Sequence, residues 1–232
     1  AADQTGGPFK NYIYGAMTPG NFVRSTDNGL SFATTFSSSN SLPGNMVAVG
    51  PNGSVQGGTV YFVKSTGSAF AATYTFNTST DGGATFNLAS TQNFANYVGT
   101  YVGGRNSVQN MRTRPYPFIA ADNSYGAYRG RVYVIYAANN PVGDGFKPDI
   151  YCRYSTDGAV TWSAGTIVND DVNSQNNNQF MPAPWCDKET GRLYVQWMDT
   201  RDCPTSDSCL IYASYSTDGG QTFVTNQPVS NK

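Results

Sequence analysis

The octapeptide Ser216-Thr-Asp-Gly-Gly-Gln-Thr-Phe223 decides the fold, because three close copies of it occur earlier in the chain. The four copies begin at residues 25, 79, 155 and 216 and share the form S-T-D-[NG]-[GA]-x-[ST]-[FW]. Their recurring serine, aspartate and aromatic positions are Ser25, Asp27 and Phe32; Ser79, Asp81 and Phe86; Ser155, Asp157 and Trp162; and Ser216, Asp218 and Phe223. Chance does not explain four copies of so specific a string, so the chain is built from internal repeats.

The chemistry of the octapeptide predicts a hairpin turn. Its aspartate can accept hydrogen bonds from backbone N–H groups two or three residues further on, and the Ser or Thr at its seventh position adds another local bond. The Gly or Asn after the aspartate tolerates a positive φ. The last aromatic residue is expected to bury its ring between neighbouring strands. The third copy has Ala159 where the others have Gly, which predicts either a strained turn or a left-handed Gly158.

The segments around each turn repeat as well. Two strand-like stretches such as Arg131-Val-Tyr-Val-Ile-Tyr136 and Asp149-Ile-Tyr-Cys-Arg-Tyr154 precede the turn, and a small-residue stretch such as Pro117-Phe-Ile-Ala-Ala121 comes earlier. With a further strand after the turn, each unit is a four-stranded antiparallel meander of about 50 residues, and radially repeated meanders are propeller blades. We therefore predict an all-β fold, a single β-propeller domain with blades at about 1–42, 43–95, 115–172 and 178–232 and an insertion at 96–114.

The first unit is incomplete, because Ala1-Ala2-Asp3 matches only the tail of an inner strand such as the one that ends at Ala120-Ala121-Asp122. The sequence leaves three explanations open. The chain is cut from a longer propeller, or it closes as a small propeller with a ragged edge. In the third, a partner subunit supplies the missing strand by strand addition, which would build a fibre when repeated head to tail.

Composition excludes several classes of protein. The 232 residues are 12% charged and 14% aromatic, with a net charge of −1, so no basic surface for nucleic acid is expected and disorder is disfavoured. No apolar run approaches the roughly 20 residues that span a bilayer. There is no histidine and a single glutamate, Glu189, which excludes a Ser-His-Asp triad, a Cys-His dyad and a His-ligated zinc.

The four cysteines suggest an oxidising compartment. Cys203 and Cys209 bracket a short polar loop, a spacing that suits a loop-closing disulfide, and Cys152 and Cys186 remain as a second pair. Four free buried thiols in a cytosolic protein are the alternative. The even cysteine count, the few lysines and the polar composition predict a secreted or cell-surface protein. Two N-x-[ST] sequons make Asn52 and Asn77 candidate glycosylation sites.

The octapeptides resemble those of the Asp-box, or BNR, repeat family, which includes sialidases and many non-enzymatic secreted propellers, and the resemblance covers essentially the whole chain. It implies that the turns are structural and lie at the outer end of each blade, away from any active site. A sialidase would also need three arginines, a Tyr–Glu pair, an Asp acid/base and an F/Y-R-I-P motif ahead of the first box. That motif is absent, Arg112-Thr-Arg114-Pro115 follows the second box, and Glu189 lies in a turn. The chain is therefore most similar to bacterial, secreted, non-enzymatic members.

Two acidic clusters and one basic segment are the candidate ligand sites. The acidic residues are Asp199, Asp202 and Asp207, near Arg201, together with Asp170 and Asp171. They would bind Ca²⁺ or a glycan, and the alternatives are an Arg–Asp ion pair that fixes the loop and a solvated turn. Arg105, Arg112 and Arg114 lie at the predicted insertion; they would grip an acidic sugar, and the alternative is hydrogen bonding to loop carbonyls.

Three functions follow as hypotheses. The first is a non-catalytic extracellular module that binds carbohydrate or glycoprotein, or that assembles with copies of itself through its open blade edge. The second is a sialidase-like glycoside hydrolase, which rests on the family resemblance alone. The third is a calcium-dependent adhesion module. Ca²⁺ is the only cofactor considered, and nucleic acid and membrane are not expected as partners.

Overall fold

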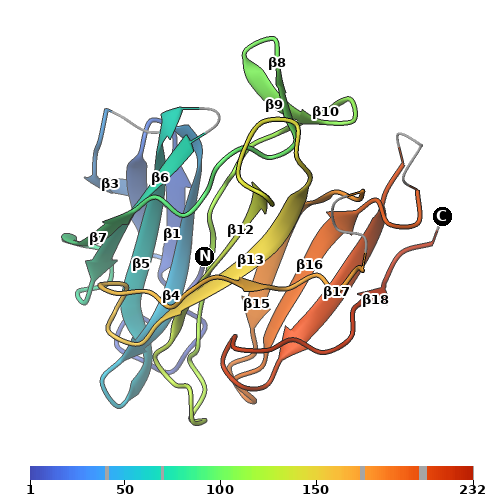
Figure 1. Cartoon of the computed structure of the whole chain (residues 1–232). Helices are drawn as coiled ribbons and strands as arrows, with labels where there is room; N and C mark the ends of the chain where they lie inside the picture. Colours follow the sequence, from blue (N-terminus) through green and yellow to red (C-terminus); the bar gives the residue numbers. More distant parts are fainter. Residues whose placement is uncertain (40–41, 69–70, 173–175, 204–207, 232) are drawn as a thin grey trace.

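The structure is a computed structural model that describes residues 1–39, 42–68, 71–172, 176–203 and 208–231. Over these ranges the chain forms five antiparallel sheets and no helix (Figure 1). The described residues thus include no helix of the length and hydropathy needed to cross a membrane.

Four of the sheets are successive blades, each made of strands that are consecutive in the sequence. Blade 1 contains β1 (Ile13–Met17), β2 (Asn21–Ser25) and β3 (Ala33–Phe36), and blade 2 contains β4 (Leu42–Asn52), β5 (Val55–Ser68), β6 (Ala71–Ser79) and β7 (Asn87–Gln92). Blade 3 contains β11 (Phe118–Ala121), β12 (Val132–Asn139), β13 (Pro148–Ser155) and β14 (Thr166–Ile167), and blade 4 contains β15 (Gln179–Cys186), β16 (Leu193–Asp199), β17 (Leu210–Ser216) and β18 (Gln227–Pro228). β4 begins at Leu42, one residue before the start of about 43 expected for the second blade.

The insertion between blades 2 and 3 forms a small sheet of its own. It contains β8 (Thr100–Val102), β9 (Arg105–Val108) and β10 (Met111–Thr113), and it projects beyond the ends of the blades (Figure 1). Asn139 of β12 fixes the start of this sheet, because its side chain accepts from the Gly99 N–H at 2.6 Å and donates to the Gly99 carbonyl at 2.7 Å.

The first residues of the chain replace the inner strand of blade 1. Ala2 forms an isolated antiparallel bridge with Ile13, and the Ala1 carbonyl accepts a hydrogen bond from the Tyr14 N–H at 2.7 Å. The Asp3 carboxylate then accepts from the Gly58 N–H of blade 2 at 3.1 Å. Residues 1–3 therefore occupy the position of a strand tail, as the sequence comparison predicts.

All four octapeptides form the same turn. Residues four and five of each copy have positive φ, including Asn28 and Gly29 in the first and Gly158 and Ala159, both at 73°, in the third. The strained alternative for Ala159 is thus correct, and Gly158 is left-handed as well. Each aspartate accepts from the side chain of residue seven at 2.5–2.7 Å and from its N–H at 2.9–3.0 Å. The backbone N–H groups that donate to the aspartate lie three and four residues after it, whereas the sequence predicted two or three. The difference arises because two consecutive residues of the turn have a left-handed conformation.

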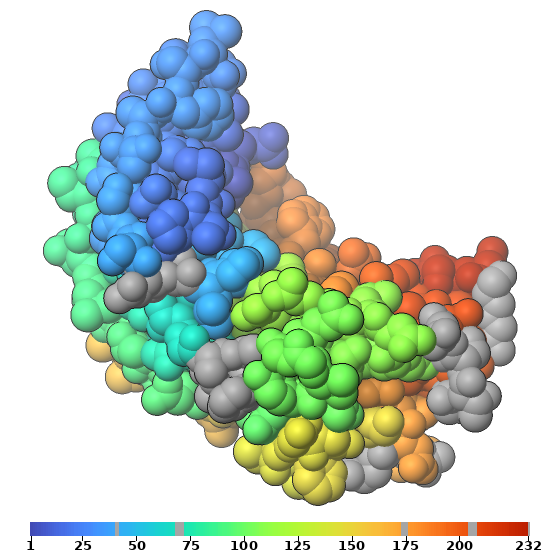
Figure 2. Space-filling view, turned by 90° about the horizontal axis from the view of Figure 1, so that it is seen from above, coloured from blue at the N-terminus to red at the C-terminus, as the bar shows by residue number. Residues whose placement is uncertain are grey.

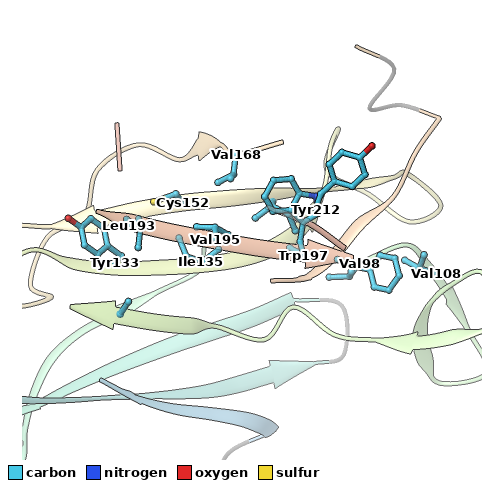
Figure 3. Packing of buried hydrophobic residues seen from close by; sticks show 14 of the residues in the cluster. Val98, Val108, Tyr133, Ile135, Cys152, Val168, Leu193, Val195, Trp197 and Tyr212 are labelled. Atoms are coloured by element: carbon cyan, nitrogen blue, oxygen red, sulfur yellow. The ribbon is translucent and has the colours of Figure 1, made fainter. Parts of the chain in front are cut away.

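The blades pack face to face along an open arc, with blade 1 at one end and blade 4 at the other (Figure 2). The inner strand β4 contacts β1 and β11, and β15 contacts β11 and β12. A separate hydrophobic cluster fills each of the three gaps between successive blades. Between blades 3 and 4, Tyr133 and Ile135 of β12 meet Leu193, Val195 and Trp197 of β16 (Figure 3).

The aromatic residue that ends each turn packs against the preceding blade in three of the four copies. Phe86 lies 4.6 Å from Phe22 between ring centroids, Trp162 lies 4.4 Å from Phe76, and Phe223 packs on the cluster between blades 3 and 4. The prediction is wrong for Phe32, which is 53% exposed. The reason is its position, because blade 1 ends the arc and no described blade precedes it.

Neither disulfide predicted from the sequence is formed, since all four cysteines are free thiols. Cys152 is fully buried between blades 3 and 4, next to Tyr133 and Gly220. Cys186 lies on a different strand, with its Sγ 3.8 Å from the Gly191 carbonyl. Burial raises the pKa of both of these thiols. Cys203 and Cys209 flank residues outside the described ranges and are partly exposed.

Candidate functional site

A groove of about 410 Å³ runs along the inner ends of all four blades. Its walls are small residues, because the inner strands converge where side-chain volume is limited. They include Ala1, Ala48, Ala120 and Val49, together with Ala2, Val47, Ile119, Ala121 and Pro184. The lining also includes Trp185 and Cys186 and the polar residues Gln4, Thr5, Asn123, Asp187 and Lys188.

Trp185 is the large aromatic residue of this groove. It lies on β15 opposite Tyr194 and is 60% exposed. The ring of Tyr194 lies 5.8 Å away at an interplanar angle of 30°, and Tyr215 lies 5.7 Å beyond Tyr194. The indole is therefore held from one side by a row of tyrosines, while more than half of its surface stays open to a ligand.

Trp185 is also an exception among the repeats. The strand registers place Ala48 opposite Tyr61, Ala120 opposite Tyr133 and Trp185 opposite Tyr194, and the Ala1 carbonyl bonds to the Tyr14 N–H at the same position of blade 1. Three blades thus have alanine where the fourth has tryptophan. A blade-by-blade alignment of the sequence contains this signal, although the turn motif alone does not reveal it.

Asp187 is the one carboxylate among the described residues that line the groove. It begins the turn after β15, where its side chain accepts from the Glu189 N–H at 2.9 Å and from the Thr190 hydroxyl at 2.7 Å. These bonds lower the pKa of Asp187, so the group is ionised at neutral pH and acts as a hydrogen-bond acceptor. Glu189 itself points away, with a side chain that is 77% exposed.

The two acidic clusters predicted from the sequence meet at Arg201. The guanidinium lies 2.8 Å from both Asp170 and Asp199 and 3.9 Å from Asp171, and it stacks on the ring of Tyr212 at 4.3 Å. An arginine at the centre of the carboxylates is the ion pair that the sequence left as the alternative to calcium. No group of three or more His, Cys, Asp or Glu side chains is arranged to hold a metal ion in the described part of the chain.

The remaining acidic residues of the cluster take other roles. Asp202 accepts a hydrogen bond from the Tyr212 hydroxyl at 2.5 Å. Asp207 lies outside the described residues. Asp170, Asp171, Arg201 and Asp202 border a shallow depression of about 340 Å³, where Arg201 is the one cation among the described lining residues.

The three arginines predicted to grip an acidic sugar do not form one site. Arg105 lines a depression of about 470 Å³ on the insertion, and neither Arg112 nor Arg114 borders it. Arg112 is exposed on β10, while the Nε of Arg114 is buried and has no hydrogen-bond partner. Arg105 lies on β9, Arg112 lies on the paired strand β10, and Arg114 follows β10, so the three side chains do not line one depression.

The two sequons differ in accessibility. Asn52 is partly exposed and donates to the Thr80 carbonyl at 3.2 Å. Asn77 is only 5% exposed, and its side-chain amide donates to the Phe62 carbonyl at 3.3 Å. A glycan has no room at Asn77, so that candidate is wrong. Glycosylation of Asn52 stays a prediction.

Solved structures with a similar fold include glycosidases. The chain superimposes on the GH93 α-L-arabinofuranosidase of Fusarium graminearum in complex with arabinobiose, with a TM-score of 0.58 and 15% identity over 89% of this chain and 56% of that one. It superimposes on the α-L-arabinanase of Penicillium chrysogenum, also with arabinobiose, with a TM-score of 0.57 and 14% identity over 93% and 58%. The fold is a β-propeller. A protein of unknown function from Dyadobacter fermentans is similar as well, with a TM-score of 0.51, 16% identity and coverage of 91% and 58%.

These likenesses show the fold alone, since the identities are all low. The propeller spans just over half the length of these structural neighbours. No protein-family model matches the chain, and no curated protein matches its sequence. Membership of the Asp-box family therefore stays an expectation from the motif.

Proposed function

We propose that this propeller binds a carbohydrate in the groove at its axis and that Trp185 is the stacking platform. The observation that carries the proposal is the exposed indole at a position where the other three blades have alanine. A sugar ring presents an apolar face of C–H groups, which packs against an aromatic face, while its hydroxyls need polar partners nearby. Gln4, Asp187 and Lys188 supply such partners along the groove.

The size and chemistry of the groove favour a short neutral saccharide. A volume of about 410 Å³ is at the lower end of ordinary ligand sites, which run from about 300 to 1,000 Å³. Among the lining side chains, the carboxylate of Asp187 and the ammonium of Lys188 leave little net charge to select an acidic sugar. Two structural neighbours were solved with arabinobiose, and a pentose disaccharide is therefore the first ligand to try.

A glycoside hydrolase is the second candidate, because the propellers to which this chain is similar are glycosidases. Hydrolysis of a glycosidic bond generally uses two carboxyl groups on either side of the bond, one of them protonated. Asp187 fits the role of an ionised carboxylate and not that of the acid, since its pKa is lowered by the Glu189 N–H and the Thr190 hydroxyl. Binding is thus the function that these described residues support, and export of the protein stays a prediction.

The test is calorimetric titration of the 232-residue chain with arabinobiose and with a panel of neutral and acidic oligosaccharides. Trp185→Ala is expected to weaken binding about tenfold, which corresponds to the roughly 1.4 kcal/mol of one aromatic contact. Phe146→Ala, which removes another exposed aromatic residue outside the groove, is the matched control and should bind as the wild type does. No binding by the wild type, or equal binding by both variants, would refute the proposal.

The same panel separates binding from hydrolysis. Release of reducing sugar above the buffer rate, at a level that Asp187→Asn abolishes, would establish the hydrolase candidate. Saturable binding with no release of reducing sugar would establish the binding module.

A further inference from the structure

The insertion between blades 2 and 3 carries only positive charge. Residues 82–121 contain Arg105, Arg112 and Arg114, and the sequence has no aspartate, glutamate or lysine in this segment. With +3 in this segment and −1 for the whole chain, the rest of the chain carries a net charge of −4. The sheet of β8, β9 and β10 is therefore a small basic unit on an otherwise acidic protein.

The two faces of this sheet differ in exposure. One face is buried, and its residues Asn106, Val108 and Thr113 are at most 2% exposed. By strand alternation the opposite face carries Thr100, Val102, Arg105, Ser107 and Arg112. On that face Arg112 pairs with Ser107, two residues from Arg105, which makes the two arginines diagonal neighbours about 7–8 Å apart.

The buried face anchors the sheet to the propeller. The Thr113 hydroxyl donates to the Val98 carbonyl at 2.6 Å, and Val98 and Val108 both belong to the hydrophobic cluster between blades 3 and 4 (Figure 3). The sheet lies in the middle of the arc, between the two end blades (Figure 2). The exposed face thus presents its two arginines from a fixed support.

A depression of about 470 Å³ opens on the exposed face. The described residues that line it are Thr100, Val102, Arg105, Ser107, Gln109 and Asn110. The Ser107 hydroxyl lies 2.9 Å from the Gln109 carbonyl and 3.2 Å from the Met111 carbonyl, so the turn between β9 and β10 is held in shape. Arg105 is the charged residue of this lining.

The charges of Arg105 and Arg112 are not neutralised by neighbours. Among the described residues, only Lys188 and Arg201 are the cations of ion pairs. Asp144 contacts the sheet by accepting from the Tyr101 N–H at 2.6 Å, but it does not border the depression. Because a guanidinium matches a carboxylate with two parallel N–H donors, this face suits an anionic group.

We propose that the exposed face of the insertion sheet binds an acidic saccharide chain. Arg105 binds the carboxylate of one uronic acid inside the depression, and Arg112 binds the carboxylate of a following sugar. The volume lies within the range of about 300–1,000 Å³ of small-molecule sites, and the hydroxyl and amide groups of the lining are partners for sugar hydroxyls. This site is separate from the groove at the axis and does not depend on the function proposed there.

The surroundings of the depression favour a saccharide over other polyanions. A long nucleic acid would be repelled by the net charge of −4 on the rest of the chain. An acidic peptide is generally recognised through pockets for its side chains or by pairing along a strand edge. Val102 is the single apolar residue among the described residues of the lining, which offers little to a peptide side chain.

The test is calorimetric titration of the 232-residue chain with a uronic acid trisaccharide at low ionic strength. The carboxyl-reduced form of the same trisaccharide is the matched control ligand, since it keeps the hydroxyls and loses the charges. Arg105→Gln and Arg112→Gln remove the two cations in turn. Arg192→Gln is the control variant, because Arg192 is also exposed but lies outside the insertion. All three side chains are exposed, so the variants are expected to fold, which circular dichroism checks.

We expect the wild type to bind the uronic acid trisaccharide and not its reduced form. Arg105→Gln should weaken binding about tenfold or more, since it removes a bidentate charge-assisted contact. Arg112→Gln should weaken it about twofold to fivefold, as for an exposed ion pair, and Arg192→Gln should bind as the wild type does.

Four results would overturn the proposal. The first is no binding of the uronic acid trisaccharide, and the second is equal binding of its reduced form. The third is binding that Trp185→Ala abolishes and Arg105→Gln leaves intact, which would place the ligand in the groove. The fourth is equal or tighter binding of a tri-aspartate peptide, which would assign the face to an acidic protein segment.

Discussion

Replacement of Arg201 by alanine is the sharpest test of how blade 4 is held to the loop that follows blade 3. The side chain makes three hydrogen bonds, to Asp199 at 3.0 Å, to Asp170 at 2.8 Å and to Asn226 at 3.0 Å. Only 16% of it is exposed, and the carboxylate of Asp199 is fully buried. Arg201→Ala therefore leaves a buried carboxylate without its counter-ion.

The magnitude follows from that burial. An exposed ion pair contributes about 0–1 kcal/mol to stability, whereas removal of one partner of a buried pair costs about 3–5 kcal/mol. Two further carboxylates, Asp170 and Asp171, face the same guanidinium, so the variant also gathers like charges at one place. We expect the free energy of unfolding to fall by about 3–5 kcal/mol. For a domain of this size the melting temperature should fall by roughly 6–20 °C.

The assay is urea unfolding at neutral pH followed by tryptophan fluorescence, with a chelator present so that a metal ion cannot replace the lost cation. Trp197 is a suitable reporter, since its Nε1 donates to Asp199 at 2.9 Å. Arg112→Ala is the control, because Arg112 is exposed on the insertion and should change stability by no more than about 0.5 kcal/mol.

Two results would refute the reasoning. The first is an Arg201→Ala protein within about 1 kcal/mol of the wild type, the range of an exposed pair. The second is a deficit that does not shrink when the pH is lowered. Protonation removes the unpaired charges, and burial already raises the pKa of the neighbouring Asp149, so acidification should narrow the difference between variant and wild type.

Three further measurements test the turns and the thiols. The Gly83→Ala protein should be about 1–3 kcal/mol less stable to urea than the Gly29→Ala protein. Both glycines have positive φ, but a Cβ at Gly83 would lie 2.8 Å from the buried Phe22 ring, while one at Gly29 meets only the end of the Ile13 side chain at 3.1 Å. Equal stabilities of the two variants would contradict this. Hydrogen bonds from the side chains of Ser31 and Ser25 lower the pKa of Asp27 to about 2. Because this folded pKa lies below the unfolded value of about 3.9, the ionised carboxylate stabilises the turn above about pH 3.9, and this stabilisation is lost as the pH falls towards 2. The melting temperature should therefore fall between about pH 3.9 and pH 2, and it should fall less steeply in Asp27→Asn. Cys152 should resist alkylation in the native protein and react after denaturation, as mass spectrometry would show, and rapid native labelling of Cys152 would contradict its burial.

The blades could be predicted from the sequence because their signals are local. Each turn is fixed by an aspartate, two residues that accept positive φ and a hydroxyl, all within eight positions. The order of the strands in each sheet could be predicted as well, since consecutive strands of a meander are neighbours. Even the inner-strand position of residues 1–3 could be identified by comparison with the segment that ends at Asp122.

The features that the sequence did not predict depend on contacts between residues far apart in the chain. Phe32 matches the motif as well as Phe86 does, but only Phe86 has a preceding blade to pack on. Asn77 satisfies a sequon, but it pairs with Phe62 of β5 inside the sheet, where its amide donates to the Phe62 carbonyl. The acidic residues around Arg201 were found by their proximity in sequence, while the geometry decides that the arginine occupies their centre.

The repeats themselves help to separate structure from function, because each blade can be compared with the other three. Positions at which the blades agree are explained by packing, as with the tyrosine at Tyr14, Tyr61, Tyr133 and Tyr194, which is buried wherever a next blade covers it. A position at which one blade departs from the others needs another cause. Trp185 stands where the other three blades have alanine. Its exposure of 60% has the same origin as that of Tyr194, since no described blade covers this face, but the packing of the described blades does not explain the change from alanine to tryptophan. A ligand in the groove supplies that cause, and for this reason the indole, rather than the motif that defines the fold, is where function should be sought.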